Sequence, residues 1–390
     1  MISVNEALDA LFALVAPLPS ETVPLTDASG RILAKDARAI RDQPPFAASI
    51  MDGYAVPVAE VATGDTFTVI GEAAAGHAFD GTLSAGQAVR IFTGAPLPDG
   101  AKRVVIQEDV CHDANTITIG AEIDSALYIR PSGADFKAGD ALTAPRHLTP
   151  SDLALLAAMN HPTVEVTRKP VVAIIATGDE LVQPGETPGP DQIIASNSYG
   201  LKALLEKNGA EVRLLPIARD NLASLELAFS LADGADLVVT IGGASVGDHD
   251  LVAAAAASRG MERSFYKIAM RPGKPLMAGR LGSATMIGLP GNPVSAMVCG
   301  HVFVLPVLRK MLRLGAAPAE RQTAPLAHDI PANGPREHYM RAKLEGGKVT
   351  IFERQDSALL TVLADANCLC VRPPHAASAT KGETVEIILL

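Results

Sequence analysis

The feature that most constrains the fold is a long stretch, residues 171–293, in which short apolar runs alternate with helical segments. At its centre lies Ile241–Asp250, a glycine-rich segment that follows the apolar run Asp236–Ile241 and precedes the alanine-rich segment Leu251–Ala257. A strand that passes through a glycine-rich turn into a helix leaves backbone N–H groups free at the positive end of the helix dipole. The pattern therefore predicts an anion-binding turn.

Other segments of this stretch have the same organisation. Val171–Ala176 and Glu211–Pro216 are predicted strands, and Asn197–Lys207 is a predicted helix between them. Phe265–Met270 and Thr285–Leu289 are further apolar, strand-like runs. Strands that alternate with helices predict a parallel, doubly wound sheet, and ligands bind beyond the carboxyl ends of its strands. Each predicted strand here ends in a turn that carries glycine, proline, a carboxylate or a base.

Length and charge limit the class of protein. A chain of 390 residues is too long for one ordinary core, so several domains are expected. The net charge of −10 argues against a nucleic-acid partner, and an anionic substrate would need a local basic cluster. Four cysteines do not make a disulfide framework, and Cys368 and Cys370 are predicted to share a core face of one strand.

No targeting or membrane segment is expected. The first nine residues lack the basic and apolar regions of a signal peptide. The apolar segment Val294–Leu308 contains His301 and Pro306, and we expect it to be broken and too short to span a bilayer. These patterns predict a cytoplasmic protein without a membrane partner.

The predicted fold class is multidomain α/β plus β. Residues 1–45 and 131–166 are predicted to form a discontinuous helical and linker domain, with an all-β domain, 46–130, inserted in it. Residues 167–315 form the central doubly wound α/β domain, and 320–390 form a small β-barrel without a helix. We expect a helix at Ser151–Met159 to pack on the N-terminal helix that begins after Ser3.

Six short motifs occur along the chain in a fixed order. They are Met51–Ala55, Thr93–Pro96, Thr177–Leu181, Gly242–Gly247, Pro272–Pro275 and Gly288–Ser295. Together they resemble the molybdopterin molybdenumtransferase family, which makes molybdenum cofactor and includes the C-terminal domain of gephyrin. The resemblance covers nearly the whole chain, and six motifs in order are far more specific than any one of them.

The resemblance implies a reaction and its partners. The family takes adenylylated molybdopterin and molybdate, releases AMP and places molybdenum on the dithiolene sulfurs, the last common step of cofactor synthesis. It uses Mg²⁺ and works as a homodimer. The adenylyltransferase of the same pathway and molybdoenzyme maturation proteins are further implied partners.

The same resemblance implies the residues of the site. The catalytic set is Asp52, Thr93, Asp135, Glu180, Asp220, Asp250, Lys267 and Lys274. The substrate-binding set in the central domain is Gly242, Gly243, Ser245, Gly247, Pro290 and Pro293.

The resemblance also implies binding residues for two ions, Mg²⁺ and molybdate. Mg²⁺ prefers carboxylates and phosphate oxygens, and the implied ligands are Glu180, Asp220 and Asp250. Molybdate is a tetrahedral dianion that suits fixed positive charge and hydroxyl donors, and the implied set is Arg271, Lys274, Ser295, Arg341 and Ser357. The family often has lysine at the position of Arg271. Arginine keeps the positive charge, but its planar guanidinium group changes the geometry of anion binding.

Alternative interpretations stay open at this point. Glu180, Asp220 and Asp250 also suit helix caps at strand–helix turns. Gly243–Gly247 fits the Gly-x-Ser-x-Gly pattern of a serine hydrolase, with Ser245 as nucleophile and Asp329 and His338 downstream. Against the hydrolase, the helix is predicted to begin several residues after the serine. A non-catalytic scaffold of the same fold is the third alternative.

Asp52 and Thr93 lie in the inserted domain, far along the chain from the predicted sheet. A structural Asp-Gly turn has no need of a carboxylate at Asp52. In the family the inserted domain faces the α/β domain of the partner subunit. We therefore expect a homodimer in which Asp52 of one chain completes the active site of the other.

Overall fold

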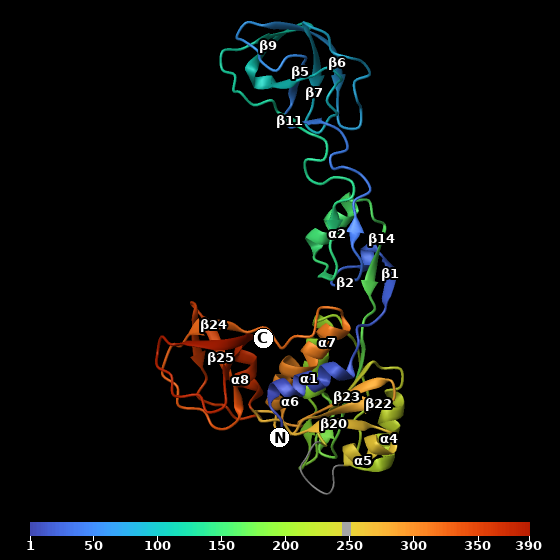
Figure 1. Cartoon of the computed structure of the whole chain (residues 1–390), viewed down its shortest axis with the longest axis vertical. Helices are drawn as coiled ribbons and strands as arrows, with labels where there is room; N and C mark the ends of the chain where they lie inside the picture. Colours follow the sequence, from blue (N-terminus) through green and yellow to red (C-terminus); the bar gives the residue numbers. More distant parts are fainter. Residues whose placement is uncertain (244–250) are drawn as a thin grey trace.

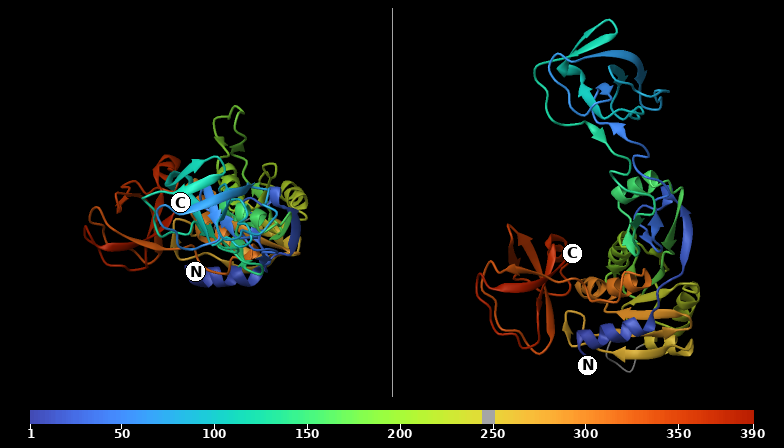
Figure 2. Two further views of the ribbon diagram at one scale, coloured as in Figure 1. Left: turned by 90° about the horizontal axis from the view of Figure 1, so that it is seen from above. Right: turned by 45° about the horizontal axis from the view of Figure 1, so that its top comes forward.

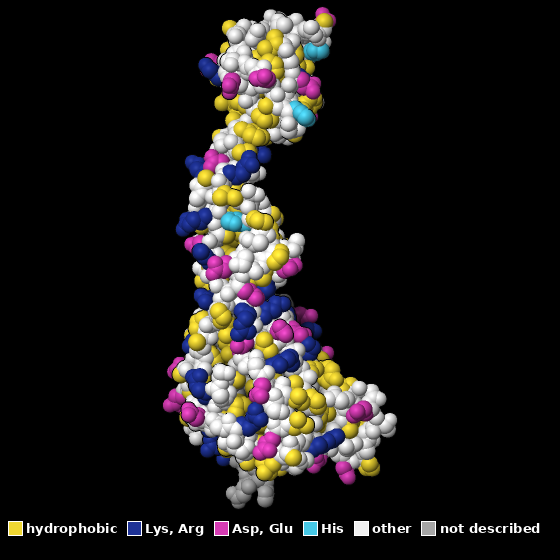
Figure 3. Space-filling view, turned by 90° about the vertical axis from the view of Figure 1, so that its right-hand side faces the viewer, with side chains coloured by type: hydrophobic (Ala, Val, Ile, Leu, Met, Phe, Trp, Pro, Cys, Tyr) yellow, Lys and Arg dark blue, Asp and Glu magenta, His cyan; other side chains and the backbone are white. Residues whose placement is uncertain are grey.

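The computed structural model describes residues 1–243 and 251–390. The chain forms an elongated column of three bodies, and the C-terminal domain lies beside the lowest of them (Figures 1 and 2). On the face seen in Figure 3, basic and acidic side chains are interspersed along the whole length of the column. The column form follows from the β insertion, which interrupts the middle body and lies at the far end.

The central domain is a six-stranded sheet in the order β18–β15–β19–β23–β22–β20. Its strands are β15 (Val171–Ala176), β18 (Glu211–Leu214), β19 (Leu237–Ile241), β20 (Glu262–Tyr266), β22 (Met277–Leu281) and β23 (Ala284–Leu289). The first four in spatial order are parallel, as predicted. Strand β22 runs antiparallel to both of its neighbours, β23 and β20, and was not predicted. The predicted strand Phe265–Met270 is wrong in extent, because β20 ends at Tyr266 and the chain turns into a separate short strand at Met270.

Helices cover both faces of this sheet. On one face α3 (Asn197–Lys207) packs with the helical run α6 (Pro293–Cys299), η3 (Gly300–Val304) and α7 (Leu305–Met311). On the other face lie α4 (Leu222–Leu231) and α5 (Leu251–Ser258). The predicted doubly wound architecture is confirmed.

The apolar segment after Pro293 is a continuous helical run, Pro293–Met311, so the prediction that it is broken and too short is wrong. The π-helical turn η3 shifts the hydrogen-bond pattern just before Pro306, which has no N–H to donate. The run has the length and apolar composition of a membrane span among the described residues, but 72% of its most apolar window is buried inside the domain. Such burial is typical of the core helix of a soluble protein.

The N-terminal helix α1 (Val4–Leu14) begins with the predicted capping box of Ser3 and Glu6. Its apolar stripe is buried in the core of the central domain, against α7, β20 and β22. The expected packing of α1 on the helix near residue 151 is therefore wrong. That helix, α2 (Pro150–Ala158), belongs to a separate small core. An amphipathic stripe indicates that a face is buried but not which surface buries it.

The middle body is built from two separate parts of the chain. Its main sheet has the order β1 (Ser20–Pro24), β14 (Thr163–Thr167), β2 (Ile32–Leu33) and β13 (Arg146–His147). A second pair joins β3 (Ala37–Arg38) to β12 (Ala141–Leu142), and η1 (Leu25–Asp27) packs near α2.

The inserted domain carries six strands in the order β8–β5–β7–β6–β10–β9. They are β5 (Gly53–Val56), β6 (Thr66–Ala73), β7 (Gln87–Ile91), β8 (Arg103–Ile106), β9 (Val110–Asp113) and β10 (Thr116–Ile119), with η2 (Gln107–Asp109) between β8 and β9. The chain enters and leaves the domain through one strand pair, β4 (Ala48–Ser49) and β11 (Ile129–Arg130).

The C-terminal sheet has the order β21–β25–β27–β28–β24, with β26 paired to β25. Its strands are β21 (Met270–Arg271), β24 (Gln322–Pro325), β25 (Glu337–Glu345), β26 (Lys348–Ile351), β27 (Cys368–Arg372) and β28 (Thr384–Leu389). An isolated bridge between Leu326 and Val349 brings β26 toward β24, so the sheet curls back as expected for a small barrel. The expectation that this domain has no helix is wrong, because α8 (Leu360–Asp365) covers its side toward α6. Strand β21 comes from the central domain and ties the two domains together.

Candidate active site

A cavity of about 880 Å³ lies at the carboxyl edge of the central sheet. The loops that follow β15, β18, β19 and β23 line it, and so does Ala358 of the C-terminal domain. The short pair β16 (Leu181–Val182) and β17 (Ile193–Ile194) forms one wall. This is the position at which doubly wound sheets bind their ligands. Predicted residues that line the cavity are Glu180, Asp220, Gly242, Gly243, Pro290 and Pro293.

Two carboxylates, Glu180 and Asp220, lie exposed at the rim of this cavity. Arg219 holds their loops together, because its Nη1 donates to the carbonyls of Asp179 and Leu181, each at 3.1 Å. The backbone N–H of Asp220 donates to Asp179 Oδ1 at 3.2 Å. Sequence analysis did not single out Arg219, although a base next to a predicted acidic ligand is a usable signal for a loop clamp.

The turn after β19 approaches β15 closely because it begins with two glycines. Gly242 and Gly243 have φ angles of 92° and 65°, which favour glycine. A Cβ at Gly242 would lie 2.7 Å from the carbonyl oxygen of Thr177, and one at Gly243 would overlap the side chain of Val252. The predicted residues Ser245, Gly247 and Asp250 lie outside the described residues.

The C-terminal domain closes the cavity beside α6. Asn292 Nδ2 donates to Ser357 Oγ at 3.1 Å, and the backbone N–H of Val294 donates to the carbonyl of Ser357 at 3.0 Å. Ser295 is buried one residue further along α6. The structure thus brings two residues of the predicted molybdate set, Ser295 and Ser357, to one domain junction.

Arg341, the third member of that set, is fully buried near the same junction. Its Nη2 donates to the carbonyl of Asp356 at 2.9 Å. Within the described residues its Nε and Nη1 atoms have no hydrogen-bond partner. Burial lowers the pKa of Arg341 from its ordinary value; the negative charge of Asp356 opposes this shift, and the positive charge of Arg271 adds to it. Since an unpaired buried guanidinium is costly, a bound anion would stabilise this arrangement.

The remaining predicted bases lie beside the cavity rather than in its wall. Pro275 lines the cavity, whereas Lys267, Arg271 and Lys274 are not among its lining residues. The backbone of Lys274 accepts hydrogen bonds from Ile268 and Leu276, and its side chain is exposed. The Lys267 ammonium lies 4.9 Å from the ring centroid of Tyr266.

Asp52 and Thr93, two predicted catalytic residues, are hydrogen-bonded to each other in the inserted domain. Asp52 Oδ1 accepts hydrogen bonds from the backbone N–H and the hydroxyl of Thr93, each at 2.7 Å. These bonds lower the pKa of Asp52. The pair lies beside β5, at the opposite end of the molecule from β23 (Figure 1). Asp135 is exposed in a loop where its N–H donates to the carbonyl of Gln43, also away from the cavity.

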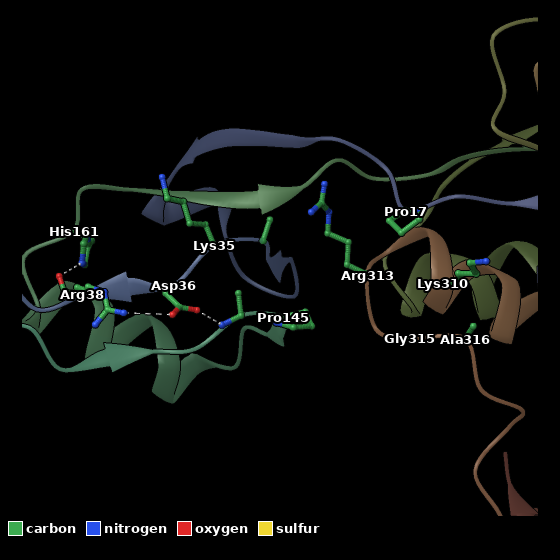
Figure 4. Close-up of a pocket in the computed structure, with 12 residues that line it drawn as sticks. Pro17, Lys35, Asp36, Arg38, Pro145, His161, Lys310, Arg313, Gly315 and Ala316 are labelled. Carbon is green, nitrogen blue, oxygen red and sulfur yellow. Dashed lines mark hydrogen bonds and ion pairs between the residues drawn. The ribbon is translucent and has the colours of Figure 1, made fainter.

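A second cavity of about 920 Å³ is slightly larger but lies far from the strand ends. Figure 4 shows it between the middle body and the end of α7, lined by basic side chains such as Lys35, Arg38 and Arg313. Arg38 and Arg313 already donate to main-chain carbonyls. Because no predicted site residue lines it, this cavity is not the candidate active site.

The hydrolase alternative lacks support among the described residues. Asp329 Oδ1 accepts a hydrogen bond from the backbone N–H of Lys381, and His338 Nε2 has no partner within the described part of the chain. The acid and the histidine therefore do not form the hydrogen-bonded pair that a catalytic triad requires.

Comparisons with known proteins agree with this geometry. Residues 2–160 match the family model of the MoeA N-terminal region (domain I and II), 173–310 a probable molybdopterin binding domain, and 323–390 the MoeA C-terminal region (domain IV). The molybdopterin molybdenumtransferase of Nostoc sp. is 36% identical over 100% of this chain and 94% of its own length. That of Haemophilus influenzae is 35% identical over 99% of this chain and 98% of its own length.

Solved structures give the same result. The molybdopterin biosynthesis MoeA protein of Pyrococcus horikosii superposes with a TM-score of 0.86 at 31% identity, over 100% of this chain and 99% of its own. A second MoeA structure, from Pyrococcus horikoshii OT3, has a TM-score of 0.84 at 27% identity and covers 100% of both chains. The chain therefore belongs to the MoeA family, whose curated relatives are named molybdopterin molybdenumtransferase.

Proposed function

We propose that this chain inserts molybdenum from molybdate into adenylylated molybdopterin and releases AMP. The observation that carries the proposal is the cavity at the carboxyl edge of the central sheet, with Glu180 and Asp220 at its rim and the Gly242–Gly243 turn in its wall. An anhydride of two phosphates needs backbone N–H donors and neutralisation of its charge; the glycine turn would supply donors, and a cation held by the two carboxylates would supply the positive charge.

We propose Mg²⁺ as the cofactor, held by Glu180 and Asp220. Mg²⁺ is usually bound through one or two carboxylates together with substrate phosphates and water. Two exposed carboxylates at a cavity rim fit that requirement. Among the described residues no three His, Cys, Asp or Glu side chains are grouped as a complete metal cage, so the substrate would supply the remaining ligands. When bound, Mg²⁺ would neutralise charge on the phosphate oxygens as the anhydride is cleaved.

We place molybdate at the junction of the central and C-terminal domains. The unpaired N–H groups of Arg341 and the hydroxyls of Ser295 and Ser357 meet the needs of a tetrahedral dianion. The exposed ammonium of Lys274 lies in the loop that leads to Pro275, a residue of the cavity wall. Arg341 would hold the dianion, and the exposed lysine would meet it as it arrives from solvent.

We further propose a homodimer in which Asp52 of one chain reaches the cavity of its partner. Asp52 and Thr93 are ordered by two hydrogen bonds yet lie far from the cavity of their own chain. The neighbouring side chains Ile50 and Met51 are 39% and 37% exposed, and burial against a partner would remove this apolar surface from water. The hydrogen bonds from Thr93 lower the pKa of Asp52 and so favour its charged form.

The proposed reaction also leads us to expect a cellular compartment and partner proteins. We expect the chain to act in the cytoplasm, to receive its nucleotide substrate from the adenylyltransferase of the same pathway, and to pass product to molybdoenzyme maturation proteins. We expect no nucleic-acid or membrane partner, because the net charge is −10 and the most apolar helix is largely buried.

AMP release tests the proposed reaction. Purified full-length protein is incubated with adenylylated molybdopterin, and AMP is measured with and without molybdate and Mg²⁺. We expect AMP only when both are present, and Asp220→Ala should reduce the rate by at least about 100-fold because a metal ligand is lost. Glu226→Ala, an exposed acid on α4 outside the cavity, is the matched control and should leave the rate unchanged. Wild-type protein that releases no AMP under these conditions would refute the proposal.

A further inference from the structure

Three basic side chains stand side by side on adjacent strands of the C-terminal sheet. In the parallel pair β21–β25, Arg271 is in register with His338. In the antiparallel pair β25–β27, His338 is in register with Arg372. Residues in register on neighbouring strands project from the same face of a sheet. Arg271, His338 and Arg372 therefore form one row, which we call the basic row.

The basic row faces away from Arg341. Met270 and Tyr339 pack in the core shared with the central domain, and Arg341 lies on the same face of β25 as Tyr339. Ala342 and Cys370 pack in the separate barrel core on the opposite face. Since side chains alternate along a strand, the basic row belongs to the barrel face. The predicted molybdate set is thus divided, with Arg271 on one face and Arg341 on the other.

Two members of the row are buried without full hydrogen bonding. His338 and Arg372 are 8% and 7% exposed. Within the described residues, His338 Nε2 and Arg372 Nε have no partner, and Arg372 donates only through Nη2, to the carbonyl of Ala377. Of the ion pairs formed by the described residues, none involves a side chain of the row. Buried donors without an acceptor are costly, so an anionic ligand would stabilise the row.

The charge state of His338 fits a donor role. Burial, together with the nearby positive charges of Arg271, Arg341 and Arg336, lowers the pKa of His338 to about 4. The imidazole is therefore neutral near pH 7 and carries one N–H group. A tautomer with the proton on Nε2 would add a neutral donor to the row, in which His338 stands between Arg271 and Arg372 in register.

We propose that Arg271, His338 and Arg372 form a second oxyanion site, on the barrel face of the C-terminal sheet, which takes a free tetrahedral dianion. Two guanidinium groups supply charge and paired donors, and the imidazole adds a neutral donor. Molybdate, sulfate and hydrogen phosphate share this chemistry. If molybdate is the ligand, the row is a loading site on the face of β25 opposite the proposed Arg341 site, and this assignment alone rests on the proposed function.

Calorimetric titration of the full chain with molybdate or sulfate, without any pterin, tests the site. We expect Arg372→Gln to weaken one binding event by about tenfold or more, because a charge-assisted hydrogen bond is lost. Arg372→Lys keeps the charge and should lose only part of that affinity. Lys343→Gln removes an exposed base from the neighbouring strand β25 and is the matched control. Arg341→Gln should remove a different binding event.

A second readout does not depend on the stability of the variants. In wild-type protein with ¹³C-labelled histidine, the imidazole signal that His338→Gln removes should shift and saturate as the oxyanion is added. A shift with both anions supports a general oxyanion site, and a shift with molybdate alone supports a loading site. The inference is overturned if neither anion moves the signal, or if Arg341→Gln and Arg372→Gln abolish the same single event. Because no pterin is present, these results are independent of AMP release.

Discussion

At the scale of single residues, the bond between Asp52 and Thr93 controls the charge of a proposed catalytic group. The backbone and side-chain hydrogen bonds from Thr93 lower the pKa of Asp52. Thr93→Val keeps the backbone bond and removes the hydroxyl bond. The pKa of Asp52 should then rise toward its ordinary value, because the charged form loses a donor. The acid limb of the pH profile of AMP release should move to higher pH, and the rate near pH 8 should change less.

The control is Thr116→Val, which changes an exposed threonine of β10 in the same domain. It should leave the profile unmoved. An identical acid limb in Thr93→Val and the wild type would show that Asp52 does not control the pH dependence of the reaction.

At the scale of elements, the turn between β19 and α5 needs glycine for two reasons. Gly243 has a φ of 65°, and a Cβ there would overlap Val252 of α5. Gly243→Ala should destabilise the fold by about 1–2 kcal/mol for the backbone and about 1–3 kcal/mol more for overpacking. Gly260→Ala, where φ is 79° and nothing lies within 4 Å, should show only the backbone cost, about 1–2 kcal/mol. Urea unfolding measures the free energy of unfolding of both variants. Equal losses of stability would contradict the close approach of the turn to the helix.

At the scale of the whole molecule, the elongated column separates Asp52 from the cavity of its own chain. If the site is shared between chains, Asp52→Ala and Asp220→Ala homodimers should each be nearly inactive. Mixed dimers of the two variants should recover up to about half of the wild-type activity per dimer. One of their two sites is then built from the intact Asp52 of one chain and the intact Asp220 of the other. AMP release after co-refolding measures the recovery.

The matched control mixes Asp52→Ala with Thr93→Ala, whose lesions lie in the same domain, and should give no recovery. An absence of rescue for the first mixture, with dimers confirmed by light scattering, would require each site to be built within one chain.

Local sequence patterns determined much of the fold and part of the site. The strand Val171–Ala176 and the helix Asn197–Lys207 have the predicted bounds, because apolar periodicity and stop signals act within a few residues. Glu180, Asp220 and Gly242 line one cavity as expected, since parallel strands end at the same edge of a sheet. The chemical types of group needed for phosphate and Mg²⁺ were also readable from these strand ends.

Only the tertiary structure decided how distant segments meet. The burial of α1 on the central domain depends on competition between surfaces, which no local pattern records. The placement of Arg271 beside His338, on the face opposite Arg341, depends on the register between strands far apart in sequence. A shift of one residue in that register would reverse the face, so the division of the basic residues is a property of the folded chain alone.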